Sequence, residues 1–90
     1  MNKVLVEVLG TVPPCSRCNL TFKTVEKAVS EMNRQDLEIQ VEKRNCSDRE
    51  TIRRFGIIVP PAVSINSVIR IAGRIPNESE VKTLIEKAVS

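Results

Sequence analysis

The chain has 90 residues, of which 14 are Lys or Arg and 11 are Asp or Glu, so its formal net charge at pH 7 is +3. A chain of this length predicts one small domain, which we take to span residues 1–90. With no Trp or Tyr and only two Phe, it lacks an aromatic surface on which single-stranded nucleic acid could stack. We therefore expect no nucleic-acid partner and a mildly basic, solvated surface.

Neither a signal peptide nor a membrane span is apparent in the sequence. Only six residues separate the initial Met1-Asn2-Lys3 from Gly10, and one of them is Glu7, so this apolar stretch is too short for a signal peptide. No segment approaches the ~20 apolar residues of a membrane-spanning helix. We therefore expect a cytoplasmic monomer, in a reducing compartment where a close cysteine pair is more often catalytic than structural.

The first half of the chain predicts a strand, a helix and a second strand. Val4–Leu9 is apolar at nearly every position, which is typical of a strand covered on both faces. Residues 37–42 alternate between apolar and polar, which predicts a half-buried strand at an edge of the sheet. Between them, residues 16–32 carry an apolar stripe at helical spacing, formed by Cys18, Phe22, Val25, Val29 and Met32. Together the three elements predict a right-handed βαβ unit with parallel strands.

Glu7 interrupts the first strand. Because Glu is seldom buried without a partner, we expect this side chain at the surface. The alternative is a partly buried carboxylate near the cysteines that accepts a proton.

The second half predicts a short helix, a hairpin and a final helix. Ser47 and Glu50 match a capping box, with Ser47 as N-cap. The helix that follows should turn Ile52 and Phe55 inward and end at Gly56. Two β-branched runs, 62–65 and 68–71, flank the Asn66-Ser67 pair and predict a tight hairpin.

A second capping box, Asn77 with Glu80, precedes the final helix. That helix should pack through an apolar stripe of Val81, Leu84, Ile85 and Ala88. The order of elements is therefore β-α-β-α-β-β-α, an α/β arrangement with a four-stranded mixed sheet.

Two cysteines, Cys15 and Cys18, lie where the first strand hands over to the first helix. A helix N-terminus favours a negative charge, so a thiol at this place should have a lowered pKa, and Arg17 adds a positive charge nearby. The spacing lets the second sulfur close a small disulfide with the first, which is a layout for thiol–disulfide exchange. Two alternatives remain: half of a zinc site, or buried packing residues. Zinc usually needs four Cys or His ligands, and the chain has no His and one further cysteine, so we expect no bound metal.

That further cysteine, Cys46, follows the second strand. In a parallel sheet it would lie at the same edge as the cysteine pair, where it could act as a third redox thiol or a metal ligand. The alternative is a small packing residue.

The order of elements, with Cys15-Ser16-Arg17-Cys18 after the first strand and Pro60-Pro61 before the third, resembles the thioredoxin fold with helices on both faces of the sheet. The chain is most similar to the small, glutaredoxin-sized thioredoxin-like proteins of bacteria and archaea. Further motifs that carry the resemblance are Pro61-Ala62-Val63-Ser64-Ile65 and Gly73-Arg74-Ile75-Pro76.

The resemblance implies a mechanism and a site. Cys15 would attack a partner disulfide and Cys18 would resolve the mixed disulfide, with no cofactor beyond the Cys15–Cys18 disulfide itself. Pro61 would be cis and would shape the groove where a partner backbone docks, beside Pro60, Ser16 and Arg17. Pro60 has no N–H to offer a bound peptide, which departs from thioredoxin.

The resulting hypothesis is a thiol–disulfide oxidoreductase that acts on protein disulfides and is regenerated by a reductase. The other hypotheses are a soft-metal or metalloid carrier, since such carriers also place a cysteine pair between a strand and a helix, and a non-catalytic redox-sensing module. Carriers of that kind usually have the order β-α-β-β-α-β.

Overall fold

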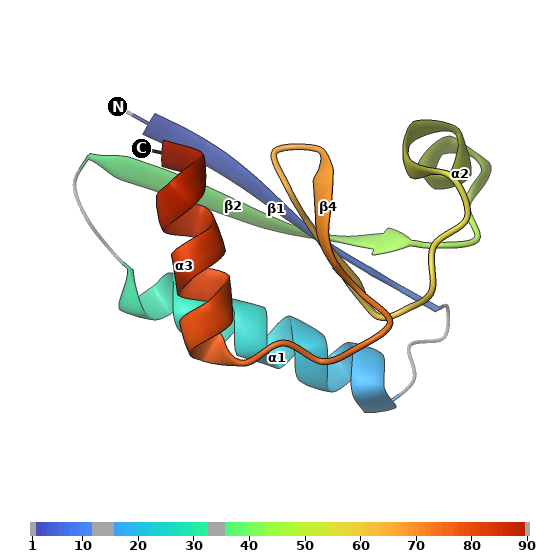
Figure 1. The fold of residues 1–90 in the computed structure, drawn as a ribbon, viewed down its shortest axis with the longest axis horizontal. Coiled ribbons are helices and arrows are strands. Elements are labelled where there is room, and N and C mark those ends of the chain that lie inside the picture. Colours follow the sequence, from blue (N-terminus) through green and yellow to red (C-terminus); the bar gives the residue numbers. More distant parts are fainter. Residues whose placement is uncertain (1, 12–15, 33–35, 90) are drawn as a thin grey trace.

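The computed structural model describes residues 2–11, 16–32 and 36–89. The observed order of elements is the predicted one (Figure 1). In chain order they are β1 (Asn2–Gly10), α1 (Ser16–Glu31), β2 (Leu37–Asn45), α2 (Arg49–Phe55), β3 (Ala62–Ile65), β4 (Val68–Ala72) and α3 (Glu78–Val89).

The four strands form one mixed sheet in the order β2-β1-β3-β4. β2 pairs parallel with β1 over nine residues, which confirms the predicted βαβ unit, and it lies at an edge as its alternating sequence indicated. β3 runs antiparallel to β1, with Ala62 opposite Leu9, and β4 completes the hairpin. The carboxyl ends of β1 and β2 and the start of β3 therefore lie side by side at the same edge of the sheet, the edge formed by the strand ends.

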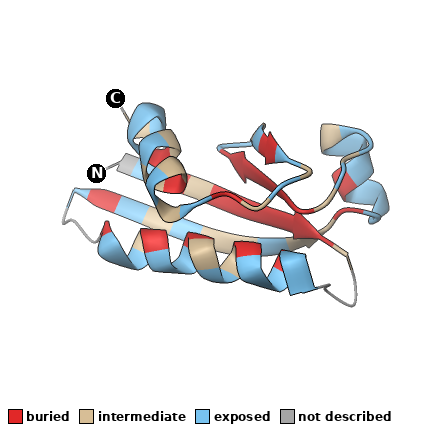
Figure 2. Ribbon diagram, turned by 60° about the horizontal axis from the view of Figure 1, so that its bottom comes forward, coloured by how far each residue is buried: buried red, intermediate tan, exposed pale blue. Residues whose placement is uncertain are grey.

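Successive side chains of β1 point to opposite faces of the sheet. Val4, Val6 and Val8 face the main core, which α1 and α3 cover together. On the other face Leu9 packs with Phe55, at the end of α2. Helices thus cover both faces, as predicted, and Figure 2 shows the buried positions concentrated in β1 and β3 and along the inner sides of α1 and α3.

The start and the inner face of α2 differ from the predictions. Its N-cap is Asp48 rather than Ser47, and no side-chain hydrogen bond caps the helix. Ile52 is 41% exposed, and Thr51 is the buried residue of the helix. The first hydrogen bond of the helix is donated by the Ile52 N–H to the Asp48 carbonyl, so Ser47 lies one residue before the cap, where its own N–H donates to the Asn45 side chain.

The turn between β3 and β4 is the predicted Asn66-Ser67 pair. Both residues have positive φ, 50° and 68°, as the two central residues of a type I′ turn require. Asn66 also joins the turn to β1, because its side-chain oxygen accepts a hydrogen bond from the Leu5 N–H at 2.9 Å.

The N-terminus of α3 carries half of the predicted capping box. The Asn77 side chain accepts a hydrogen bond from the Glu80 N–H at 2.8 Å, as an N-cap does. The Glu80 carboxylate does not reach back toward Asn77; it pairs with Arg74 instead. Val81 and Ile85 are buried as predicted, whereas Ala88 is exposed.

Candidate functional site

The candidate site lies where β1 ends and α1 begins. Cys15 and the preceding residues 12–14 fall outside the described part of the chain, so the predicted nucleophile has no described position. Ser16 is the first residue of α1 and is exposed, as is Arg17. Cys18 is in the first turn of α1 and is buried, with 4% of its surface exposed.

Cys18 packs tightly against the end of β1. A Cβ built on Gly10 would lie 3.0 Å from both Cβ and Sγ of Cys18, so only glycine allows the helix to approach the strand so closely. The hydroxyl of Thr11 lies 4.0 Å from the Cys18 sulfur, within reach of a weak hydrogen bond. These contacts fix the second cysteine of the pair against the sheet.

A cavity of about 230 Å³ opens beside Cys18, between α1 and β2. Its lining is mainly apolar and includes Val8 and Phe22. Lys43 of β2 also lines it, and the Lys43 ammonium lies 4.4 Å from the centre of the Phe22 ring. The cavity leaves room for the Cys18 sulfur to move on the β2 side.

The second part of the site is the segment that enters β3. The peptide bond between Pro60 and Pro61 is cis, and Pro61 is buried. Because Ala62 lies opposite Leu9 in the antiparallel pair, Pro61 reaches the end of β1 at Gly10, against which Cys18 packs. The structure thus brings the Cys18 turn and the proline segment to one edge of the sheet.

Gly73 ties these parts together. Its N–H donates to the carbonyl oxygens of both Val59 and Pro61, each at 2.9 Å. Its own carbonyl accepts a hydrogen bond from the Arg17 guanidinium at 3.3 Å. Arg17 therefore links the first turn of α1 to the proline segment through Gly73.

Two exposed apolar side chains extend this surface and were not singled out by the sequence. Ile57 is 95% exposed and Val59 is 65% exposed, whereas Ile58 between them is half-buried. Exposed apolar side chains that lie close together in one segment can form part of a protein-binding surface. The signal in the sequence was the apolar run 57–59 directly before the two prolines, in a segment with no helical or strand periodicity.

The prediction that Glu7 lies at the surface is wrong. The side chain is fully buried and accepts four hydrogen bonds: 2.9 Å from Arg44, 2.9 and 3.0 Å from Arg54, and 3.2 Å from Ser64. Burial by itself opposes ionisation of Glu7, but the hydrogen bonds from Arg54 and Arg44 outweigh it and hold the pKa of the carboxyl below its ordinary value. Glu7 is therefore an ionised, paired carboxylate.

The alternative role of Glu7, accepting a proton from the cysteines, does not fit its position. Glu7 is on the same face of β1 as Leu9, two residues further on, and Gly10 is on the opposite face with Cys18. The sheet therefore separates the Glu7 carboxylate from the Cys18 sulfur.

Cys46 also comes to this edge of the sheet, since its N–H donates to the Gly10 carbonyl at 2.9 Å. Its side chain is buried on the α2 side, in a cluster with Leu9 and Ala62, and it forms no disulfide with any described residue. Within residues 2–11, 16–32 and 36–89, no three His, Cys, Asp or Glu side chains are grouped so that they could hold a metal ion. The contacts that the structure describes for the Cys46 side chain are packing contacts.

No helix in the described ranges combines the length and the apolar character that crossing a membrane requires.

Comparisons with known proteins identify the family to which this chain belongs. A family model described as a thioredoxin domain matches residues 4–86. A thioredoxin of Methanocaldococcus jannaschii is 33% identical over 79 residues, which cover 88% of this chain and 83% of that protein. A probable thioredoxin of Methanothermobacter thermautotrophicus is 34% identical over 79 residues, 87% of either chain, and no solved structure matches at a comparable level. As its motifs predicted, the chain belongs to the thioredoxin family.

Proposed function

We propose that this protein is a thiol–disulfide oxidoreductase that exchanges disulfides with protein partners through Cys15 and Cys18. Membership in the thioredoxin family supports the reaction class. The observation that carries the assignment of residues is the packing of Cys18 against Gly10, at the sheet edge that also holds the cis Pro60–Pro61 bond. A buried cysteine one turn from a helix N-terminus is suited to resolving a bond that a neighbouring cysteine has formed.

The reaction proceeds in two exchanges. The Cys15 thiolate attacks one sulfur of the partner's disulfide, forms a mixed disulfide and releases the other partner sulfur as a thiolate. The Cys18 thiolate then attacks the Cys15 sulfur, forms the Cys15–Cys18 disulfide and releases the second partner sulfur. The partner is reduced by two electrons and takes up two protons, and the cysteine pair is oxidised by the same two electrons. A reductase of the cytoplasm returns these electrons to the pair.

The chain's own residues prepare both steps. The dipole of α1 favours a thiolate at the residue that precedes the helix, Cys15. The first turn of α1 adds the positive charge of Arg17 and contains no acidic residue that would oppose this effect. The Gly10 contact blocks movement of the Cys18 sulfur toward β1, so the sulfur can move only on the side of the cavity next to β2. A partner backbone would dock along the segment that contains Val59 and Pro60, beside the exposed Ile57.

Reduction of insulin by dithiothreitol tests this proposal. The wild-type protein should accelerate the reaction, Cys15→Ser should abolish the acceleration, and Cys18→Ser should accumulate a mixed disulfide with insulin that mass spectrometry detects. Cys46→Ser is the matched control and should keep wild-type turnover. Activity retained in Cys15→Ser would contradict the assignment.

The soft-metal alternative is tested with the same variants. The order of elements differs from the β-α-β-β-α-β order usual in soft-metal carriers, which disfavours this alternative. Stoichiometric Cu(I) binding that depends on Cys15 and Cys18, without turnover of insulin, would favour it over the oxidoreductase.

A further inference from the structure

α2 is the helix that leads into the proposed docking segment, and it is the least attached of the three. α1 and α3 both pack along β1, whereas α2 makes little backbone contact with the sheet, and Thr51 is its buried residue. Figure 1 shows α2 standing at one end of the molecule, next to the ends of β1 and β2. Its position must therefore depend on a few side chains.

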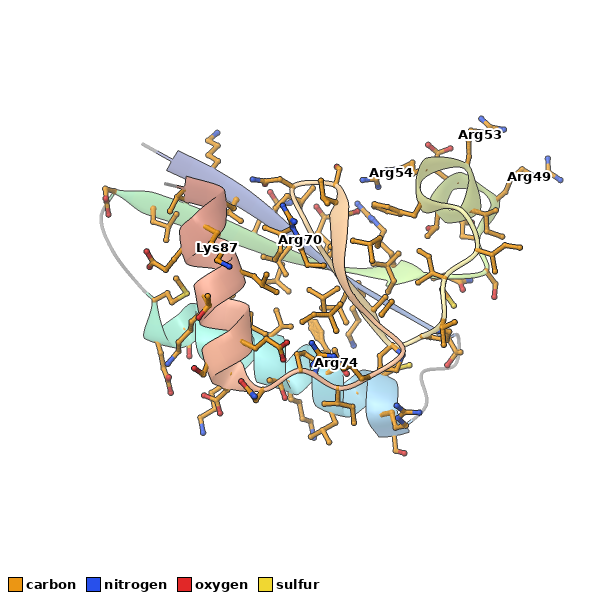
Figure 3. All side chains as sticks on the ribbon, viewed as in Figure 1. Arg49, Arg53, Arg54, Arg70, Arg74 and Lys87 are labelled. Carbon is orange, nitrogen blue, oxygen red and sulfur yellow. The ribbon has the colours of Figure 1, made fainter. Side chains whose placement is uncertain are left out.

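Two adjacent residues in the last turn of α2 hold it to the sheet. Phe55 packs against the cluster that contains Leu9 and Cys46. Arg54 donates two hydrogen bonds to the buried Glu7 carboxylate, at 2.9 and 3.0 Å, and a third to the Ser67 hydroxyl at 3.1 Å. In Figure 3 Arg54 points from α2 back toward the sheet, whereas Arg49 and Arg53 point away from it.

The geometry of this ion pair is directional. A guanidinium that makes two parallel hydrogen bonds with one carboxylate fixes orientation as well as distance. Glu7 is itself held at several points, because it lies in a central strand and also accepts hydrogen bonds from Arg44 and Ser64. The Arg54–Glu7 pair therefore fixes the last turn of α2, directly before the chain leaves the helix at Gly56.

The docking segment, residues 56–61, is held by polar contacts at both ends, and Ile58 within it packs against the cluster of Leu9, Cys46 and Ala62. At its start stands the Arg54–Glu7 pair, two residues before Gly56. At its end, the carbonyl oxygens of Val59 and Pro61 accept hydrogen bonds from Gly73. Ile57, between the two anchors, is almost fully exposed, so its position follows from the anchors and not from packing of its own.

We propose that Glu7 and Arg54 are positioning residues for partner docking: they orient the start of segment 56–61 so that it accepts a protein disulfide. This inference rests on the proposed function. It assigns to a carboxylate on the far side of the sheet from Cys18 a role in recognising protein substrates and none in the exchange chemistry.

The inference predicts a difference between large and small substrates. We expect the insulin KM to rise about five- to tenfold in each of Arg54→Met and Glu7→Gln, with kcat nearly unchanged, because only docking is disturbed. This rise is smaller than the ~100-fold loss of rate that misplaced reacting groups can cause. The rate with 5,5′-dithiobis(2-nitrobenzoic acid), which is too small to use the segment, should stay within about twofold. Arg54→Lys should recover part of the insulin KM.

One matched variant separates positioning from general stability. Arg53→Met removes the neighbouring arginine of α2, which is exposed and points away from the sheet, and it should keep the wild-type insulin KM. A fall that is equal for insulin and for the small disulfide would mean a merely structural role and would overturn the inference. An unchanged insulin KM in both Arg54→Met and Glu7→Gln would also overturn it.

Amide hydrogen exchange gives a readout that does not depend on activity. Ile57, Ile58 and Val59 should exchange faster in Arg54→Met than in Arg53→Met, while β1 should stay protected in both. If the wild-type protein reduced neither disulfide, the proposed function would fail, and equal exchange of this segment in the two variants would separately refute the positioning role.

Discussion

Replacing Gly10 with alanine adds one methyl group at the contact between β1 and α1. The new Cβ would lie 3.0 Å from the Cβ and the Sγ of Cys18, closer than carbon or sulfur atoms ordinarily pack. Cys18 is buried, so its Cβ cannot withdraw without shifting the first turn of α1. Its sulfur has one direction of escape, the cavity on the β2 side.

Two opposing terms set the size of the effect. A Gly-to-Ala change inside a strand normally stabilises by about 0.5–1 kcal/mol, since glycine loses more conformational freedom on folding. Overpacking of a well-packed site costs about 1–3 kcal/mol. With both terms at the middle of their ranges, we expect Gly10→Ala to lower the free energy of unfolding by about 1 kcal/mol. For a domain of this size that corresponds to a Tm lower by roughly 4–8 °C.

Urea denaturation of the reduced protein measures the stability term, and insulin reduction measures displacement of the Cys18 sulfur. Asn77→Ala is the matched control: it removes the N-cap of α3, which does not contact Cys18, and should cost about 0.5–2 kcal/mol. Both variants should therefore lose stability, but only Gly10→Ala should slow resolution of the mixed disulfide. A Gly10→Ala protein as stable as the wild type, with normal turnover, would refute the close contact.

Three further predictions concern stability. Glu7→Gln should lower the free energy of unfolding by about 1–3 kcal/mol at pH 7. Because the folded pKa of Glu7 lies below its ordinary value, the stability advantage of the wild type should be full above pH ~5 and should disappear as the pH falls through the folded pKa. Urea titrations of both proteins between pH 7 and pH 2 would measure this difference. Asn77→Ala removes the N-cap of α3 and should cost about 0.5–2 kcal/mol in the same assay; no loss would mean that the cap contributes nothing. Ser67→Gly replaces a residue with a φ of 68° and should raise the free energy of unfolding by about 0.5–1 kcal/mol, reduced by the contribution of the exposed hydrogen bond from Arg54 that the change removes. A lower Tm than that of the wild type would contradict this.

Periodicity, together with cap and turn signals, was sufficient to predict the order of the elements. The helical stripe from Cys18 to Met32 and the alternation that starts at Leu37 are local patterns, and each element forms where its pattern lies. The hairpin turn at Asn66 was equally readable, since few residue pairs accept two successive positive φ angles. Local patterns were less able to place the start of α2. Ser47 and Asp48 are both good N-caps, and the choice between them depends on the preceding turn rather than on the helix.

The surroundings of Glu7 could not be predicted from local patterns. Its partners Arg44, Arg54 and Ser64 follow it by 37, 47 and 57 residues, so no spacing in the sequence relates them. The burial of Glu7 therefore becomes intelligible only when the register of the sheet and the position of α2 are known. Its one trace in the sequence was an acidic residue in the middle of an apolar strand, which indicates either an exposed edge or a buried partner.

The sheet separates two groups of side chains: the Cys18 sulfur lies on one side of β1 and the Glu7–Arg54 pair lies on the other. Side chains that share no neighbours usually vary independently in their energetic effects. On the roles proposed above, substitutions near Cys18 would change the driving force of electron transfer, substitutions at the Glu7–Arg54 pair would change the choice of partner, and the two effects would be largely independent. The same division offers a protein engineer two separate controls within ninety residues.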